Sequence, residues 1–206
     1  MYVVYLGRIH MGGNLSSKSI TFVAVMAALG NVLSFISIRL APIVPNISMG
    51  FTSFSLALDL SHLATFIAAF FGGPVIGGLT GLIGGLVAAF EFGFSKGNLL
   101  TGFGLPIGKA LTGLTAGVLI TRMSVEKERS RTVLYTVFSY IPEGTWTVII
   151  FLLLFPFFIP FSSIWVRAFT VQVLVKAVIE MIVMGLLLAG MLANRGFTDY
   201  VRGFFS

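Results

Sequence analysis

Six ionisable side chains lie within otherwise apolar stretches of this chain. They are Asp59, Glu91, Lys109, Glu143, Lys176 and Glu180. A charge is costly in hydrocarbon, so such residues usually face a protein-lined interior, where they bind a solute or form tight ion pairs. The pattern predicts a membrane protein that holds or pairs something polar inside it.

Each of these charges also has a purely structural interpretation. Lys176 and Glu180 are four residues apart, which places them on one helix face where they can pair with each other. Asp59 can cap the helix that it precedes. Glu91 can lie at headgroup depth together with Lys96. Ligand binding and structural pairing are both open for each residue taken singly.

The composition sets the class of protein. The chain has 206 residues, of which 57% are hydrophobic and 10% charged, with a mean hydropathy of +1.03. Soluble domains have about 25% charged residues. The longest polar run, residues 122–132, is a loop, so ATP hydrolysis has to come from a partner. The net charge of +6 sits in short loops and tails, where membrane topology explains it without a nucleic-acid partner.

We predict an all-α polytopic membrane protein with six transmembrane helices. A bilayer-spanning helix needs about 17–25 mostly apolar residues. The spans cover about residues 19–38, 54–71, 74–91, 103–121, 132–155 and 164–193. Gly72-Gly73-Pro74 separates the second and third spans as a tight hairpin. Residues 1–18 and 194–206 are then cytoplasmic tails on a transmembrane substrate-binding domain, residues 19–193.

The distribution of basic residues predicts the orientation. Cytoplasmic loops carry an excess of Lys and Arg. With both termini inside, three basic residues lie outside, namely Arg39, Lys96 and Arg167. Eight lie inside: Arg8, Lys18, Arg122, Lys127, Arg129, Arg131, Arg195 and Arg202. This bias predicts cytoplasmic N- and C-termini.

The orientation then gives each polar residue a depth, at about 1.5 Å per helical residue. Asp59, His62 and Glu91 are expected near the outer ends of their helices, and Lys109 in the outer half. Glu143, Lys176 and Glu180 are expected near or just below the mid-membrane level. A cavity open to the outside follows, closed by the long first outer loop around residues 40–54. Aromatic side chains can wall a planar solute there, namely Phe51, Phe54 and Trp146.

Small residues recur every four positions in two spans. The third span has Gly73, Gly77, Gly81, Gly85 and Ala89, and the fourth has Gly104, Gly108, Thr112 and Ala116, with Gly113 and Gly117 beside them. Such ladders let helix backbones approach closely, so we expect these two spans to pack together. Ala24 and Ala28 form a shorter pair that can pack internally or face another membrane subunit.

Motifs for chemistry are weak. Gly93-Phe94-Ser95-Lys96-Gly97 matches a nucleophile elbow, but the elbow needs a strand–turn–helix setting and a histidine partner. No phosphate-binding loop occurs. Without cysteines, thiolate metal sites are excluded, and the two histidines are too far apart in expected depth to share a metal. We therefore expect no enzyme activity, no cofactor and no metal.

The chain resembles the substrate-binding S component of energy-coupling factor (ECF) transporters, riboflavin-type branch. The resemblance rests on the size, the six expected spans, Ala24-xxx-Ala28 and the long first outer loop running into Leu58-Asp59-Leu60-Ser61. It also rests on Phe70-Phe71-Gly72-Gly73-Pro74-Val75-Ile76-Gly77, which is similar to that branch's hairpin into a glycine-rich third helix.

The resemblance implies ATP-driven uptake of a vitamin or related micronutrient across a prokaryotic plasma membrane. It implies a transmembrane coupling subunit that contacts Ala24 and Ala28, and two cytoplasmic ATPases. Riboflavin-type members carry Asn and Lys three residues apart on the last helix. Here Lys176 is preceded by Val173 at that spacing, and Gln172 stands four residues before it.

The expected substrate-binding residues are Lys109, Glu143, Trp146, Gln172, Lys176, Phe51, Phe54, Asp59 and Glu91, with Glu143 either a ligand or the partner of Lys176. The alternative is a stand-alone, proton-coupled secondary transporter with Glu143, Lys176 and Glu180 as a proton relay. Such transporters are often built from inverted repeats, which this sequence does not display. A membrane-embedded enzyme is a third possibility, with no coherent nucleophile–base pair behind it.

Overall fold

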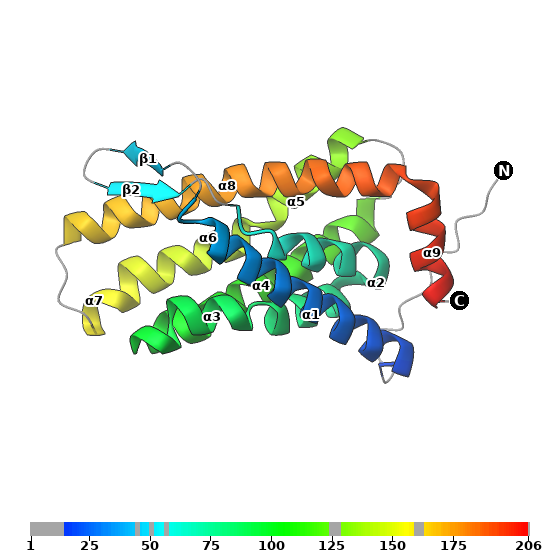
Figure 1. Cartoon of the computed structure of the whole chain (residues 1–206), viewed down its shortest axis with the longest axis horizontal. Coiled ribbons are helices and arrows are strands. Elements are labelled where there is room, and N and C mark those ends of the chain that lie inside the picture. Colours follow the sequence, from blue (N-terminus) through cyan, green and yellow to red (C-terminus); the bar gives the residue numbers. More distant parts are fainter. Residues whose placement is uncertain are drawn as a thin grey trace.

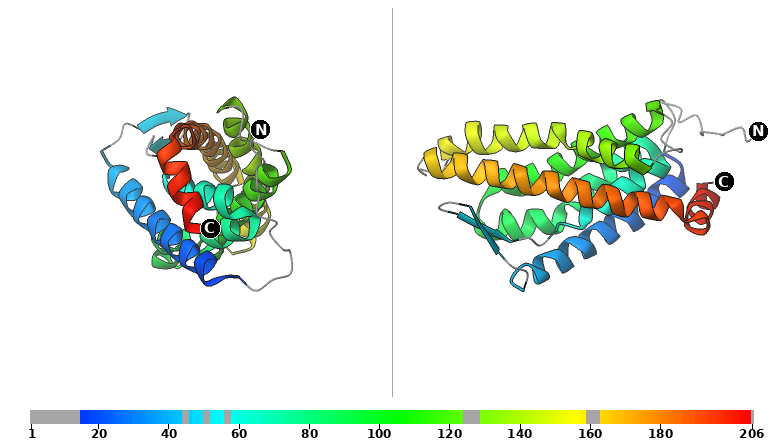
Figure 2. Two further views of the ribbon diagram at one scale, coloured as in Figure 1. Left: turned by 90° about the vertical axis from the view of Figure 1, so that its right-hand side faces the viewer. Right: turned by 90° about the horizontal axis from the view of Figure 1, so that it is seen from above.

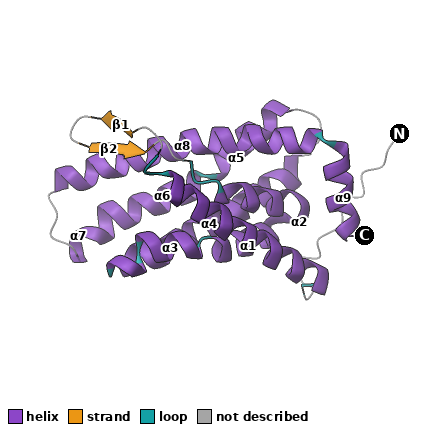
Figure 3. Cartoon of the chain, in the orientation of Figure 1, coloured by secondary structure: helices purple, strands orange, loops and turns teal. Residues whose placement is uncertain are grey.

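The computed structural model describes residues 15–43, 46–49, 52–55, 58–123, 129–158 and 163–205, with backbone only for residues 46–49, 52–55, 123, 129 and 163. Over these ranges the chain forms an elongated helical bundle with one small β-hairpin (Figure 1, Figure 3). The all-helical fold class is thereby confirmed for nearly all of the described chain.

Four long helices build the bundle: α1 (Ser17–Leu40), α2 (Ser61–Gly84), α4 (Leu99–Met123) and α8 (Ser163–Ala193). The shorter helical elements are α3 (Leu86–Phe92), η1 (Phe94–Lys96), α5 (Arg129–Ser139), α6 (Ile141–Val148), the π-helical η3 (Ile149–Leu154), α7 (Phe155–Phe158) and α9 (Arg195–Phe205). Strands β1 (Asn46–Met49) and β2 (Thr52–Ser55) pair antiparallel.

Five stretches of the described chain are long and apolar enough to cross a membrane. They are Ser17–Leu40, Ser61–Lys96, Leu99–Arg122, Ser130–Phe158 and Ile164–Ala193. The chain is therefore compatible with a multi-pass membrane protein. The second stretch is divided into two arms, so the predicted count of six spans and the side on which the termini lie stay predictions.

Helix α2 reverses direction at Gly73, which has φ 81°. This left-handed conformation is one that glycine adopts without a steric penalty, and Pro74 follows it. A Cβ on Gly77 would lie 2.6 Å from the Cβ of Ala69, so the residues on either side of the turn face each other. The predicted hairpin at residues 72–74 is confirmed.

The first arm of α2 begins later than predicted. The span expected from residue 54 starts at Ser61, because Thr52–Ser55 pairs with Asn46–Met49 in the β-hairpin. The arm from residue 61 to residue 72 is therefore about 18 Å long at 1.5 Å per residue. A hydrocarbon core is about 30 Å thick, so this arm by itself is too short to cross one.

The second arm of α2 packs against α4 through backbone contact. A Cβ on Gly77 would lie 2.6 Å from the carbonyl oxygen of Gly113, and one on Gly85 would lie 3.0 Å from Cα of Pro106. The predicted packing between the two glycine ladders is confirmed for these residues. The N-terminal part of the α4 ladder does not face α2, because Gly104 and Gly108 face η3 and α6 instead.

One side chain of α1 holds the break between α2 and α3 together. The amide of Asn31 donates to the carbonyl of Ile83 at 2.9 Å and accepts from the amide of Val87 at 2.9 Å. Both backbone groups lie next to the break at Gly85. Such groups are costly to leave unpaired in a membrane, so Asn31 fixes α1 against this kink.

The first residues of α1 and helix α9 lie at one end of the bundle, and the β-hairpin lies at the other (Figure 1, Figure 2). Residues 194–206, predicted as a tail, form α9 as far as Phe205 instead. Phe205 packs edge-on against Phe22 at 4.8 Å between ring centroids, and Phe197 against Phe71 at 5.9 Å.

Candidate functional site: a charge cluster inside the bundle

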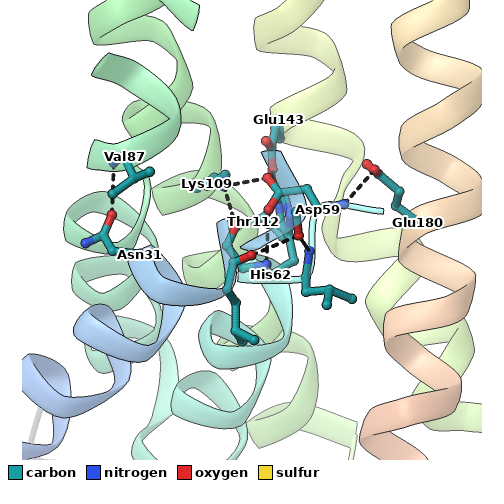
Figure 4. A network of polar contacts seen from close by, with 12 residues as sticks. Asn31, Asp59, His62, Val87, Lys109, Thr112, Glu143 and Glu180 are labelled. Carbon is teal, nitrogen blue, oxygen red and sulfur yellow. Dashed lines mark hydrogen bonds and ion pairs between the residues drawn. The ribbon is translucent and has the colours of Figure 1, made fainter. Parts of the chain in front are cut away.

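The structure gathers polar side chains from α2, α4, α6 and α8 at one level inside the bundle (Figure 4). We call this the interior cluster: Asp59, Ser61, His62, Lys109, Thr112, Glu143, Lys176 and Glu180. Hydrogen bonds and ion pairs join these residues across helices that are far apart in the sequence.

The cluster is built around the N-terminus of α2. The amide of Ser61 donates to Asp59 Oδ1 at 3.0 Å, the amide of Asp59 to Glu180 Oε1 at 2.8 Å, and the amide of Leu60 to Ser37 Oγ at 3.1 Å. The first amides of a helix lack partners within it, and carboxylates are favourable at this positive end. The N-cap position itself is Leu60, and Asp59, one residue before it, accepts the amide of Ser61 at the start of the helix.

Lys109 and Asp59 form the first ion pair of the cluster. Lys109 Nζ lies 2.7 Å from Asp59 Oδ2 and also donates to the hydroxyl of Ser61. The Lys109 side chain is 3% exposed and that of Asp59 27%. Asp59 precedes the span. Burial favours its neutral form, but Lys109, with His62 and Ser61, outweighs burial and lowers the pKa of Asp59 below its usual value.

Glu143 and His62 form the second contact. His62 Nε2 lies 3.2 Å from Glu143 Oε2, and the hydroxyl of Thr112 donates to the same oxygen. A Cβ on Gly108 would lie 3.0 Å from Cγ of Glu143, so this glycine leaves room for the carboxylate. His62 Nδ1 is buried and has no hydrogen-bond partner within the described part of the chain.

Lys176 and Glu180 form the third contact. Lys176 Nζ lies 3.1 Å from Glu180 Oε1, and the same oxygen accepts the amide of Asp59. The expected pairing of these two residues on one helix face is confirmed. The alternative pairing of Lys176 with Glu143 is wrong, because Glu143 projects from α6 towards His62 and Thr112.

Two further predicted binding residues lie close to these helices. Trp146 donates from Nε1 to the carbonyl of Gly104 at 3.0 Å and is half-buried. Gln172 is buried, and its Oε1 has no partner among the described residues. Neither residue has a hydrogen bond to the cluster in that part of the chain. Their roles in binding stay predictions.

The remaining predicted residues are not part of the cluster. Glu91 is exposed in α3 and has no ion pair to a described residue. Phe51 lies outside the described residues, as does the side chain of Phe54 in β2. Ala24 and Ala28 are both exposed on α1, whereas the neighbouring Ala27 is buried.

Three residues of the interior cluster were not among the expected binding residues, namely Ser61, His62 and Thr112. Asp59, His62 and Lys109 were all expected in the outer part of their spans, and the structure brings Asp59 to Lys109 and His62 to Glu143. Their depths in a membrane stay predictions. The spacing of Asp59 and His62, three residues apart at a helix start, places them on one face and was the available signal.

Comparison with known protein families, with curated proteins and with solved structures finds no match for this chain. Within the described part, no group of three or more His, Asp or Glu side chains is arranged to hold a metal ion. The interior cluster, buried among apolar helices, is therefore the candidate functional site.

Proposed function

We propose that this chain is the substrate-binding membrane subunit of an ECF-type uptake system for a vitamin or related micronutrient. The interior cluster carries the proposal. Charged residues inside a membrane bundle usually serve a solute, an ion or a proton pathway. Three ion-pair contacts meet at one level in this bundle, next to the start of a helix arm that does not cross the whole bundle.

The surface of α1 supports a partner in the membrane. Ala24 and Ala28 are exposed, and so are the larger apolar residues Ile20, Val25 and Val32. Small residues spaced by four let a second helix approach closely. We propose that this face contacts a transmembrane coupling subunit, which links the chain to two cytoplasmic ATPases in a prokaryotic plasma membrane.

The solute binds, in this proposal, where the cluster faces the β-hairpin end of the bundle. Lys109, Glu143 and Lys176 supply charge, Gln172 supplies an amide, and Trp146 supplies a flat wall. Of the six ionisable side chains in the cluster, Asp59 and Lys176 are the more exposed, at 27% and 31%, and mark the side of entry. Riboflavin is the first compound to test, followed by other water-soluble micronutrients.

The partner face provides the test of the proposal. The double variant Ala24→Leu/Ala28→Leu fills the small-residue stripe, whereas Ala168→Leu, also exposed but on α8, is the matched control. In cells that supply the coupling subunit and ATPases, the double variant should lose uptake and keep solute binding after purification. Ala168→Leu should keep both. Unchanged uptake by the double variant contradicts the proposal.

One observation favours the second candidate, a proton-coupled secondary transporter. His62 and Glu143 form a buried imidazole–carboxylate contact, and histidine is a common proton carrier in proteins. Uptake by liposomes that contain this chain alone, abolished by an uncoupler, would select this candidate. Uptake that requires the ATPases selects the first.

A further inference from the structure

The interior cluster contains one more carboxylate than ammonium group. Asp59, Glu143 and Glu180 are the carboxylates, Lys109 and Lys176 are the ammonium groups, and His62 is the sixth ionisable side chain. An unpaired buried charge is strongly unfavourable, so a neutral cluster needs one further positive charge. In the empty protein the available source is a proton shared by His62 and Glu143.

No other charged side chain of the described residues is hydrogen-bonded into the cluster. From α1 the cluster receives the hydroxyl of Ser37, which accepts the amide of Leu60. Tyr140 lies beside Glu143 and Glu180, and its phenol is uncharged at neutral pH. The hydroxyl of Thr112, on α4, donates a hydrogen bond to Glu143. The charge balance therefore depends on the imidazole and on whatever the cluster binds.

The hydrogen bonding of His62 also indicates that the cluster lacks a partner. Its side chain is 6% exposed, and Nδ1 has no partner among the described residues. When Nε2–H donates to Glu143, Nδ1 is an acceptor that lacks a donor. A proton on Nδ1 makes it a donor that lacks an acceptor. A bound solute with an N–H group supplies the missing donor to the neutral ring.

We propose that the cluster binds a cationic nitrogen compound with N–H donors, held beside His62 and Glu143, and that its binding releases the shared proton to solvent. This inference rests on the proposed solute-binding function. It identifies the solute class by one positive charge and one donor, the two things that the cluster lacks. The exchange balances, since one cation enters and one proton leaves, with no bond made to the protein.

The exchange predicts how binding depends on pH. A proton competes with the cation, so the affinity should fall on acidification, by at most about tenfold per pH unit for a single proton. A neutral solute should show little dependence. An anionic solute should bind more tightly at low pH, because it leaves the cluster with one excess negative charge unless a further proton follows it.

The first test is a micronutrient panel sorted by charge at pH 7.5. Thiamine and pyridoxamine carry a positive charge, riboflavin and pyridoxine are neutral, and biotin and nicotinate are anionic. The purified chain in detergent should be stabilised against heating by a cationic member. Calorimetry in two buffers with different ionisation enthalpies should then show release of about one proton per cation bound.

Variants separate the charge from the fold. Glu143→Gln keeps an oxygen that accepts from Thr112 and removes the charge, so cation affinity should fall about tenfold to a hundredfold. Asp199→Asn, the same change of carboxylate to amide at an exposed site on α9, should leave the affinity unchanged. The melting temperature of each variant without solute shows whether the variant is folded. If Glu143→Gln does not fold, proton release on cation binding by the unaltered protein tests the inference instead.

The outcomes distinguish this inference from the function on which it rests. A neutral or anionic micronutrient that binds tightly without proton uptake overturns the cation assignment and leaves the solute-binding function standing. Equal affinity of Glu143→Gln and the unaltered protein for a cationic member also overturns it. Stabilisation by no member of the panel counts against both.

Discussion

Removal of the Lys109 ammonium should destabilise the protein because it leaves a partly buried carboxylate without its cation. In Lys109→Met the apolar stem is replaced at similar volume, and Asp59 loses its 2.7 Å partner. Breaking a buried ion pair costs about 3–5 kcal/mol. Because the Asp59 side chain is 27% exposed, we take the lower end, about 3 kcal/mol.

For a chain of this size, 1 kcal/mol shifts the melting temperature by about 2–4 °C. Lys109→Met should therefore melt about 6–12 °C below the unaltered protein in the same detergent, as followed by the intrinsic fluorescence of its two tryptophans. Lys96→Met is the control, since Lys96 is exposed at the end of η1, and should shift melting by little.

A double variant identifies the carboxylate as the cause. Asp59→Leu in the Lys109→Met background removes the orphaned charge and should recover most of the lost stability, since an apolar pair replaces the ion pair. The reasoning is refuted if Lys109→Met melts within 2 °C of the unaltered protein, or if the double variant is no more stable than Lys109→Met.

Two further predictions concern packing and acid stability. Gly113→Val places a side chain against the carbonyl of Gly77, so size-exclusion chromatography should show no folded protein. Gly190→Val is the control and should fold, because the space around an added Cβ is open there. A folded Gly113→Val contradicts the packing. Because the pKa of Asp59 is lowered on folding, its stabilisation is complete above its unfolded value, about 4, and is lost as pH falls further. The melting difference between the unaltered protein and Asp59→Asn should therefore be constant from pH 8 to pH 5 and shrink below pH 4, and shrinkage already at pH 6 contradicts this.

Hydrophobic runs and glycine spacing predicted much of the fold. The hairpin at residues 72–74 followed from Gly73 and Pro74, and the contact between Gly77 and Gly113 followed from small residues spaced by four. These features depend on local residue types, which a sequence displays directly. The pairing of Lys176 with Glu180 was predictable for the same reason, since one helix places them together.

Features that depend on where a helix begins were not predictable in this way. The run before Ser61 is apolar enough to extend a span, but Thr52–Ser55 pairs as a strand and the helix starts later. Asp59 and His62 therefore lie at the start of the helix, where His62 contacts Glu143. The strands pair over only ten residues, from Asn46 to Ser55, and the hydropathy used to place spans does not detect so short a hairpin.

Helix α9 was missed for a different reason. A span search looks for apolar residues on all sides, whereas α9 is apolar on one face, with Phe197, Val201 and Phe205 towards the bundle. Their spacing of four is visible in the sequence once a helix on the bundle end is considered. The contacts of Phe205 with Phe22 and of Phe197 with Phe71 place this helix over the hairpin turn of α2.

The most direct test of the central claim is to purify the chain from cells without added solute and identify what it carries. Native mass spectrometry of the detergent-solubilised protein, followed by fragmentation of any released small molecule, gives its identity and stoichiometry. The account predicts one micronutrient per chain, lost or reduced in Glu143→Gln and retained in Asp199→Asn. A protein that purifies empty, and that binds no micronutrient added at saturating concentration, would contradict the account.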